Sequence, residues 1–150
     1  MSAPSGQPGY AEFVLFRLEE MLCGIDILQV QEIKRLARLT PVPRSPGYVR
    51  GVVNMRGQIV TALDVRQRFG LDPIDVERPV LAIIIPRGEE LLGLLVDEVE
   101  DVVRAEKDAV VSLPANVRGP QRHYLDGILT LDGALVSIVD KERIVEVGEQ

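Results

Sequence analysis

The chain has 150 residues, a net charge of −6 and a single cysteine, Cys23. This length suits one domain or two very small domains packed together. One cysteine excludes an internal disulfide bond, and the acidic charge disfavours nucleic-acid and anionic-membrane partners, which require a basic footprint. Because no apolar run reaches 18 residues, we expect no membrane insertion and predict a soluble cytoplasmic protein.

The N-terminal segment MSAPSGQPGY is rich in Pro, Gly and Ser and lacks the basic and apolar regions of a signal peptide. We therefore predict a disordered lead over residues 1–10 and a folded region over 11–147. Within that region, short apolar segments rich in β-branched residues are separated by Pro and Gly clusters, which predicts a mostly β fold. The predicted strands are 12–18, 59–65, 80–86 and 135–141.

Residues 92–103 are ambiguous, because their apolar positions also fit helical spacing. Their valine content favours strands, with a short helical turn either at 28–30 or at 97–99. Two further helical turns are predicted at 64–70 and 140–145, because each begins with an aspartate that can cap backbone N–H groups.

The chain contains an internal repeat. GVVNMRGQIVTALD (51–64) aligns with GILTLDGALVSIVD (127–140), and GIDILQVQEI (24–33) aligns with GLLVDEVEDV (93–102). Two copies are too few for a solenoid. The repeat therefore predicts two small β barrels side by side, over about 11–70 and 79–147, and closing each sheet would remove exposed edges. Whether strands cross between the barrels is left open by the sequence.

No catalytic or metal-binding pattern is evident. His123, the only histidine, lies in a polar loop, and Cys23 has no basic or histidine neighbour in sequence. The acidic segment 97–101 lacks the glycine and spacing of a calcium loop. We expect no catalytic residues, no metal and no cofactor, and we expect a protein that acts by binding.

The hairpin tip at Arg56-Gly57 is unusual, because such tips favour Asn-Gly or Asp-Gly. The second copy has Asp132-Gly133 at the same position. An acid is kept at Glu32 and at its equivalent Asp101, so only the first copy has a potential acid–base pair. Arg56 is either a solvated turn residue or, with Glu32, part of a patch for a partner, a role in which arginine is over-represented.

The string from Pro46 to Val60, together with GLLVDEV and the second hairpin, resembles the CheW family of chemotaxis coupling proteins over about residues 11–147. The resemblance implies a mostly β fold of two packed five-stranded SH3-like β barrels. It also implies a non-enzymatic adaptor that links the cytoplasmic hairpin tip of chemoreceptors to the regulatory domain of a histidine autokinase. It further implies a location in receptor arrays at the inner face of the membrane, and it leaves open whether copies self-associate in array rings. The implied kinase-binding residues are Val30, Glu32, Gly51, Arg56 and Gly57, and the implied receptor-binding groove is Val14, Ile27, Val30, Ile33 and Val99.

Two alternatives stay open at this stage. The chain could be a small-barrel module that binds a peptide or protein unrelated to chemotaxis. It could also be a CheW-like adaptor in a motility or pili pathway.

Overall fold

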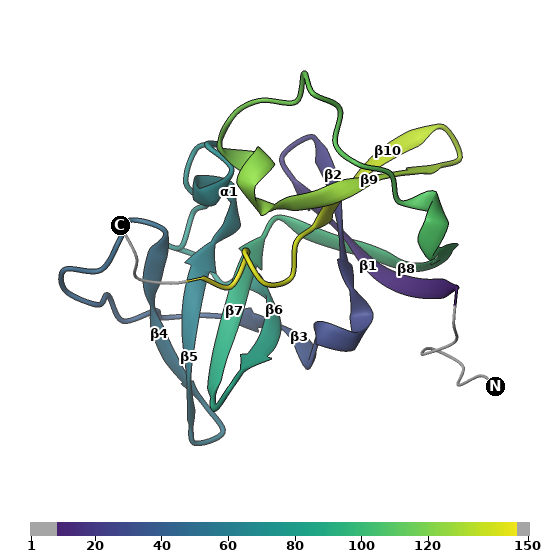
Figure 1. Ribbon diagram of the computed structural model, residues 1–150. Coiled ribbons are helices and arrows are strands. Elements are labelled where there is room, and N and C mark those ends of the chain that lie inside the picture. The colour runs from purple at the N-terminus through teal and green to yellow at the C-terminus, as the bar shows by residue number, and fades with distance from the viewer. Residues whose placement is uncertain (1–8, 147–150) are drawn as a thin grey trace.

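The computed structural model describes residues 9–146 and contains two five-stranded sheets packed against each other (Figure 1). One sheet has the strand order β8-β1-β2-β10-β9, and the other has the order β3-β6-β7-β5-β4. We call them sheet A and sheet B. Sheet A consists of β1 (Tyr10–Leu18), β2 (Met21–Asp26), β8 (Glu98–Glu106), β9 (Leu125–Leu131) and β10 (Ala134–Val139). Sheet B consists of β3 (Glu32–Leu36), β4 (Val49–Met55), β5 (Gln58–Asp64), β6 (Val80–Arg87) and β7 (Glu90–Val96).

Each sheet closes into a small barrel in the same way. In sheet B, Thr40 follows β3 and forms a backbone bridge to Val52 on β4, which joins the two edges of the sheet. In sheet A, Val111 follows β8 and bridges to Ile128 on β9. The edge strands are therefore protected, and the predicted fold class is confirmed.

The two repeats exchange strands reciprocally. The first repeat gives β1 and β2 to sheet A and β3, β4 and β5 to sheet B, and the second repeat gives β6 and β7 to sheet B and the other three strands to sheet A. The equivalent parallel pairs β10–β2 and β5–β7 join the two contributions. The sheets therefore do not follow the predicted division at 11–70 and 79–147. Crossing, which the sequence left open, occurs after η1 (Ile27–Gln29) and at Asp97.

The predicted strands are present, with small shifts at their ends. The chain is already in β1 at Tyr10, one residue before the predicted start of the folded region. The rest of the predicted lead, residues 1–8, and the predicted end at 147 lie outside the described residues. Residues 92–103 form β7 and β8 with only Asp97 between them, so the rival helix is wrong. The turn near 28–30 is present as η1.

The two predicted helical turns differ. Asp64 caps α1 (Val65–Arg68) by accepting a 3.0 Å hydrogen bond from the Gln67 N–H. Asp140 caps in the same way, accepting from the N–H groups of Glu142 and Arg143. After Asp140 the chain forms only a turn, so no helix is present over 140–145. The remaining short helices are η2 (Lys107–Ala109) and η3 (Pro120–Tyr124).

Buried side chains form three clusters, as expected for two barrels in contact. One cluster fills sheet B and another fills sheet A. The largest lies between the sheets and draws on both. On β6, for example, Ile83 and Ile85 enter the inter-sheet core while Ile84 enters the core of sheet B, because alternate side chains of a strand point to opposite faces. Both faces of β6 are therefore buried, which explains its unbroken apolar sequence.

Candidate functional site

The β4–β5 hairpin ends in a tight turn that holds Arg56 at the surface. Arg56 and Gly57 have φ of 54° and 85°, as a type I′ turn requires at both central positions. The Asn54 side-chain oxygen accepts a 3.0 Å hydrogen bond from the Gly57 N–H, and Met55 is buried in the core of sheet B. The turn is thus anchored on its inner side, while 62% of the Arg56 side chain is exposed.

Arg56 forms an ion pair with Glu32, through its Nη2 and the Glu32 Oε2. Glu32 begins β3, where it pairs with Ile84 of β6, and the preceding Gln31 N–H donates to the Ile84 carbonyl at 2.8 Å. Because β3 and β4 are the opposite edges of sheet B, the ion pair spans the line along which this barrel closes. The sequence alone could not show this contact, since 24 positions separate the two residues.

Gly51 contributes through the backbone. It is buried on β4 with φ of 143°, and an added Cβ would lie 2.7 Å from the Thr40 carbonyl oxygen. Only glycine allows the two edges of sheet B to approach this closely. Gly57 has open space around it and is required by its positive φ alone. Val30, which ends η1, is half-buried and packs against the inter-sheet core.

The predicted receptor groove is only partly a surface. Val14 is 1% exposed and lies inside the inter-sheet core, so its prediction as a groove-lining residue is wrong for this structure. It pairs with Ile25 and Val102 on the neighbouring strands, and its side chain points inward. The half-buried members Ile27, Val30 and Val99 pack against the same core. Ile33 is 40% exposed on β3.

A cavity of about 450 Å³ lies elsewhere, between η1, η2 and the end of β10. Its walls include Phe13, Gln29 and Lys141, and none of the predicted kinase-binding or groove residues lines it. Within residues 9–146 no group of three or more His, Cys, Asp or Glu side chains could hold a metal ion. Burial raises the pKa of Cys23 to about 12, which makes it a poor nucleophile.

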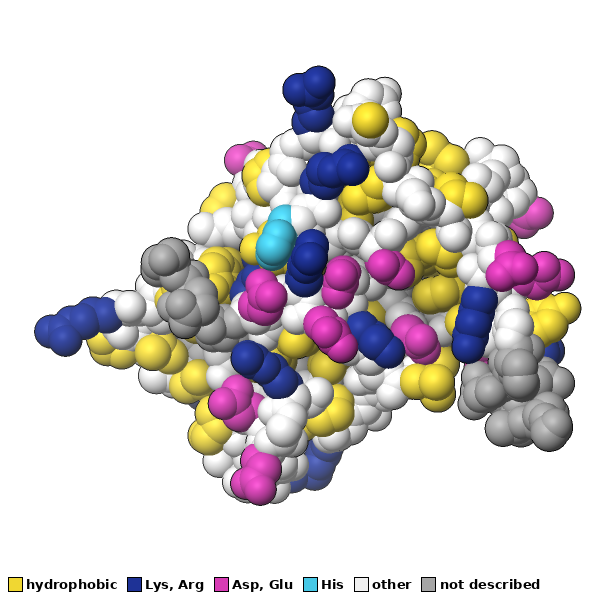
Figure 2. All heavy atoms as spheres, in the orientation of Figure 1, with side chains coloured by type: hydrophobic (Ala, Val, Ile, Leu, Met, Phe, Trp, Pro, Cys, Tyr) yellow, Lys and Arg dark blue, Asp and Glu magenta, His cyan; other side chains and the backbone are white. Residues whose placement is uncertain are grey.

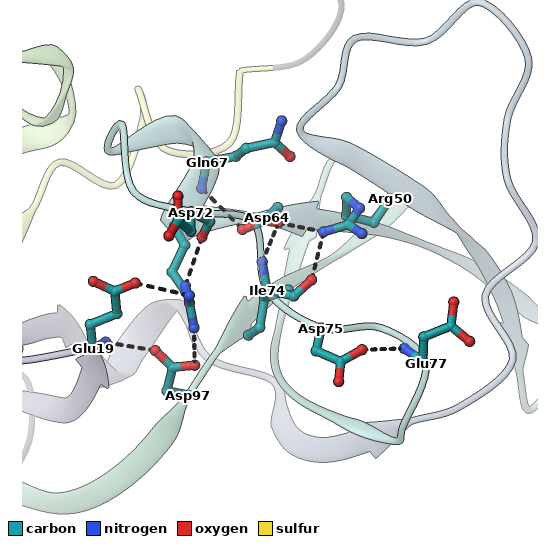
Figure 3. Close-up of polar contacts among 10 residues, drawn as sticks. Glu19, Arg50, Asp64, Gln67, Asp72, Ile74, Asp75, Glu77 and Asp97 are labelled. Atoms are coloured by element: carbon teal, nitrogen blue, oxygen red, sulfur yellow. Dashed lines mark hydrogen bonds and ion pairs between the residues drawn. The ribbon is translucent and has the colours of Figure 1, made fainter.

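Polar contacts gather around Asp64, at the end of β5 away from the Arg56 turn (Figure 3). The sequence predicted the capping role of Asp64 but none of the other contacts. Asp64 is fully buried and accepts hydrogen bonds from Arg50 at 2.6 Å and from the Ile74 N–H at 2.9 Å. Arg66 on α1 forms ion pairs with Glu19 and Asp97, each at 2.9 Å. The two Arg66 ion pairs connect the β1–β2 turn and the β7–β8 junction to α1, which follows β5 of sheet B. The only sign of these contacts in the sequence was that Asp64 and Asp140 are identical at equivalent positions of the repeat.

Comparison with known proteins identifies the family. A model described as the CheW-like domain matches residues 12–149. The chain belongs to the CheW-like domain family. It is 30% identical over 149 residues to the chemotaxis protein CheW of Klebsiella aerogenes, covering 99% of this chain and 90% of that protein. It is 28% identical over 136 residues to the chemotaxis protein CheW of Thermotoga maritima, covering 90% and 87%.

A solved structure supports the same family. The crystal structure of the scaffolding protein TtCheW from Thermoanaerobacter tengcongensis matches with a TM-score of 0.77 and 27% identity, covering 87% of this chain and 88% of that one. Both the pairing of two five-stranded sheets and the course of the chain are therefore shared with a scaffolding protein. Within residues 9–146, no helix is long and apolar enough to cross a bilayer.

Proposed function

We propose that this protein is a non-enzymatic coupling protein that connects chemoreceptors to a histidine autokinase in the cytoplasm, at arrays beneath the membrane. Membership of the CheW-like domain family and the likeness to a scaffolding protein support this role. The observation that carries it is the Glu32–Arg56 ion pair, which holds an arginine at an exposed hairpin tip where the fold also accepts an aspartate.

The kinase-docking face of the proposal comprises Val30, Glu32 and Arg56, with Gly51 and Gly57 setting its backbone. An exposed ion pair contributes only about 0–1 kcal/mol to folding, so stability alone gives little reason for it. A pre-positioned arginine, by contrast, offers a partner several donors in a fixed planar arrangement. Because Glu32 limits the freedom of Arg56, less side-chain entropy is lost when a partner binds.

The receptor-docking surface of the proposal is the half-buried edge formed by Ile27, Val30 and Val99, with Ile33 beside it. These side chains are apolar and partly accessible, and they rest on the rigid inter-sheet core. A helical hairpin tip could bury its own apolar side chains against such an edge. Signals would then pass as shifts in the population of kinase conformations, with no reaction on this protein.

Co-purification with the kinase's regulatory domain and with a receptor cytoplasmic fragment tests the proposal. The variant Arg56→Glu places two acids together and should abolish kinase capture while leaving receptor capture intact. The matched control is Asp132→Arg at the equivalent tip of the other hairpin, which should leave kinase capture unchanged. If Arg56→Glu still captures the kinase with near-native affinity, the docking face is assigned wrongly. If the wild-type protein captures neither partner, the coupling role itself is wrong.

Charge exchange sharpens the test further. The double variant Glu32→Arg/Arg56→Glu restores an ion pair with reversed polarity. If the pair acts only within the protein, kinase capture should return with the double variant. If Arg56 itself contacts the kinase, as proposed, capture should stay absent although the fold is restored, as circular dichroism and thermal unfolding would show.

A further inference from the structure

One segment of this acidic protein contains several basic residues and no acidic residue. Residues 33–63 contain six lysines and arginines and no acidic residue, in a chain whose net charge is −6. Arg50 and Arg56 are neutralised by ion pairs with Asp64 and Glu32. The other four are exposed, and within residues 9–146 their side chains make no ion pair or hydrogen bond. They are Lys34, Arg35, Arg38 and Arg44.

Two of these arginines occupy backbone positions that disfavour them. Arg38 and Arg44 have φ of 59° and 63°, in the left-handed region where glycine or asparagine is usual. Arg44 follows Pro43 in a turn closed on the Val42 carbonyl, which accepts from the Ser45 N–H at 3.3 Å and from the Ser45 hydroxyl at 2.7 Å. In such a turn glycine normally stands at the position of Arg44. Among the described residues, neither arginine side chain makes an ion pair or hydrogen bond that could offset this strain.

The segment is presented for contact. The connection between β3 and β4 projects from the body of sheet B (Figure 1), and a Lys or Arg side chain stands at the end of the same projection with hydrophobic side chains behind it (Figure 2). Val42, on this connection, is 37% exposed. The bridge between Thr40 and Val52 lays the connection against β4, the strand that leads to Arg56. The basic segment therefore begins directly after Glu32 on β3 and contacts β4 at Val52, on the strand that leads to Arg56.

We propose that residues 34–47, which we call the basic loop, extend the kinase-docking face and bind an acidic surface on the kinase's regulatory domain. This inference rests on the proposed function and adds the charge of the partner surface. An exposed, unpaired arginine with a strained backbone raises the free energy of the folded state, and an intermolecular contact would offset that cost. Strained positions of this kind concentrate at functional sites. Unpaired cations at the rim of an interface mainly accelerate association and make it salt-dependent.

The test is the association rate with the purified regulatory domain, measured by stopped flow at several salt concentrations. The double variant Arg38→Glu/Arg44→Glu should slow association by on the order of tenfold at low salt and flatten its salt dependence. The double variant Arg38→Gly/Arg44→Gly removes the charges and relieves the backbone. It should slow association by a smaller factor while the midpoint of thermal unfolding is unchanged or higher, which separates docking from folding. Association within twofold of wild type for both variants would overturn the inference.

Arg118→Glu is the matched control, because Arg118 is an exposed arginine in the equivalent connection of the other sheet. It changes the net charge as much as Arg38→Gly/Arg44→Gly does and half as much as Arg38→Glu/Arg44→Glu, and it should leave the association rate within twofold. A slowing by Arg118→Glu equal to that of Arg38→Gly/Arg44→Gly would show a net-charge effect and contradict the basic loop as the site.

Other outcomes separate this inference from the proposed function. If Arg56→Glu abolishes kinase binding while the basic-loop variants bind normally, the proposed function stands and the inference fails. If the basic-loop variants lose only receptor capture, or only self-association in sedimentation experiments without kinase, the acidic partner surface belongs elsewhere and the inference is wrong. Absence of wild-type kinase binding would overturn both.

Discussion

The two hairpins of the repeat have the same backbone and opposite charge. Arg56-Gly57 has φ of 54° and 85°, and Asp132-Gly133 has φ of 48° and 85°. The type I′ turn therefore fixes the glycine and the left-handed residue before it, but leaves the charge of that residue free. Both hairpins require the same backbone conformation, but the fold does not require the same side chain at this position. A side chain that differs between the two hairpins can therefore serve function. The comparison can be tested at positions that the hairpins share and at positions where they differ.

The largest effect is expected where the barrels close. Gly51 and Gly127 are equivalent, and an added Cβ would lie 2.7 Å from the Thr40 oxygen and 2.4 Å from the Val111 oxygen. Neither backbone can move without opening a sheet edge, so Gly51→Val and Gly127→Val should each destabilise by about 3 kcal/mol or more. Denaturant unfolding measures this. A cost under about 1 kcal/mol at one site would show that its barrel is not closed as described.

The next effect should differ between the halves. Asp64→Ala removes a fully buried carboxylate and leaves Arg50, 21% exposed, without its ionic partner. We expect a loss of about 3 kcal/mol. The equivalent Asp140→Ala removes only capping hydrogen bonds and should cost about 1 kcal/mol. Equal losses in urea unfolding would contradict the asymmetry.

A third difference between the repeats is at Cys23, whose equivalent is Leu92. Cys23 pairs with Ser137 in sheet A, and Leu92 pairs with the equivalent Thr61 in sheet B. The folded thiol has a pKa of about 12, above the ordinary value of about 8.5. A raised pKa favours the neutral thiol in the folded state, so stability is full below pH 8.5 and declines from there towards pH 12, by up to about 1.4 kcal/mol per pH unit. Comparing the free energies of unfolding of wild type and Cys23→Ala as a function of pH isolates the contribution of the thiol. Parallel stability curves above pH 9 would refute it.

The smallest effect concerns the tips themselves. Arg56→Asn should change stability by less than about 1 kcal/mol, because the exposed ion pair contributes little and asparagine tolerates positive φ. Asp132→Asn should be equally mild in thermal unfolding. The contrast between the tips should appear only in binding, where Arg56→Asn weakens kinase capture and Asp132→Asn does not. A large stability loss for Arg56→Asn would make the arginine a structural residue.

Local features were predictable from the sequence. The hairpin turns follow from glycine spacing and the caps from Asp64 and Asp140, because each depends on residues a few positions apart. The potential pairing of Glu32 with Arg56 followed from comparing the two repeats. Family resemblance then supplied roles that no spacing rule could assign.

Long-range features were not predictable in the same way. A repeat in sequence does not say which copies of a strand pair, so the exchange of strands needed the hydrogen-bond registers. The apolar sequence pattern could not show whether Val14 lies in a surface groove or in the core, because both environments favour the same residue types. Arg66 joins Glu19 and Asp97 across 47 and 31 positions, which only the closed fold brings together.

The reciprocal exchange of strands has a consequence for how the molecule holds together. Each repeat, taken alone, contributes two strands to one five-stranded sheet and three strands to the other, so it completes neither sheet. Neither half of the chain therefore encodes a complete barrel. Unfolding of one repeat removes strands from both sheets. The two barrels must form and unfold as a single cooperative unit. A force applied at the proposed docking face on sheet B is borne by covalent chain that also runs through sheet A.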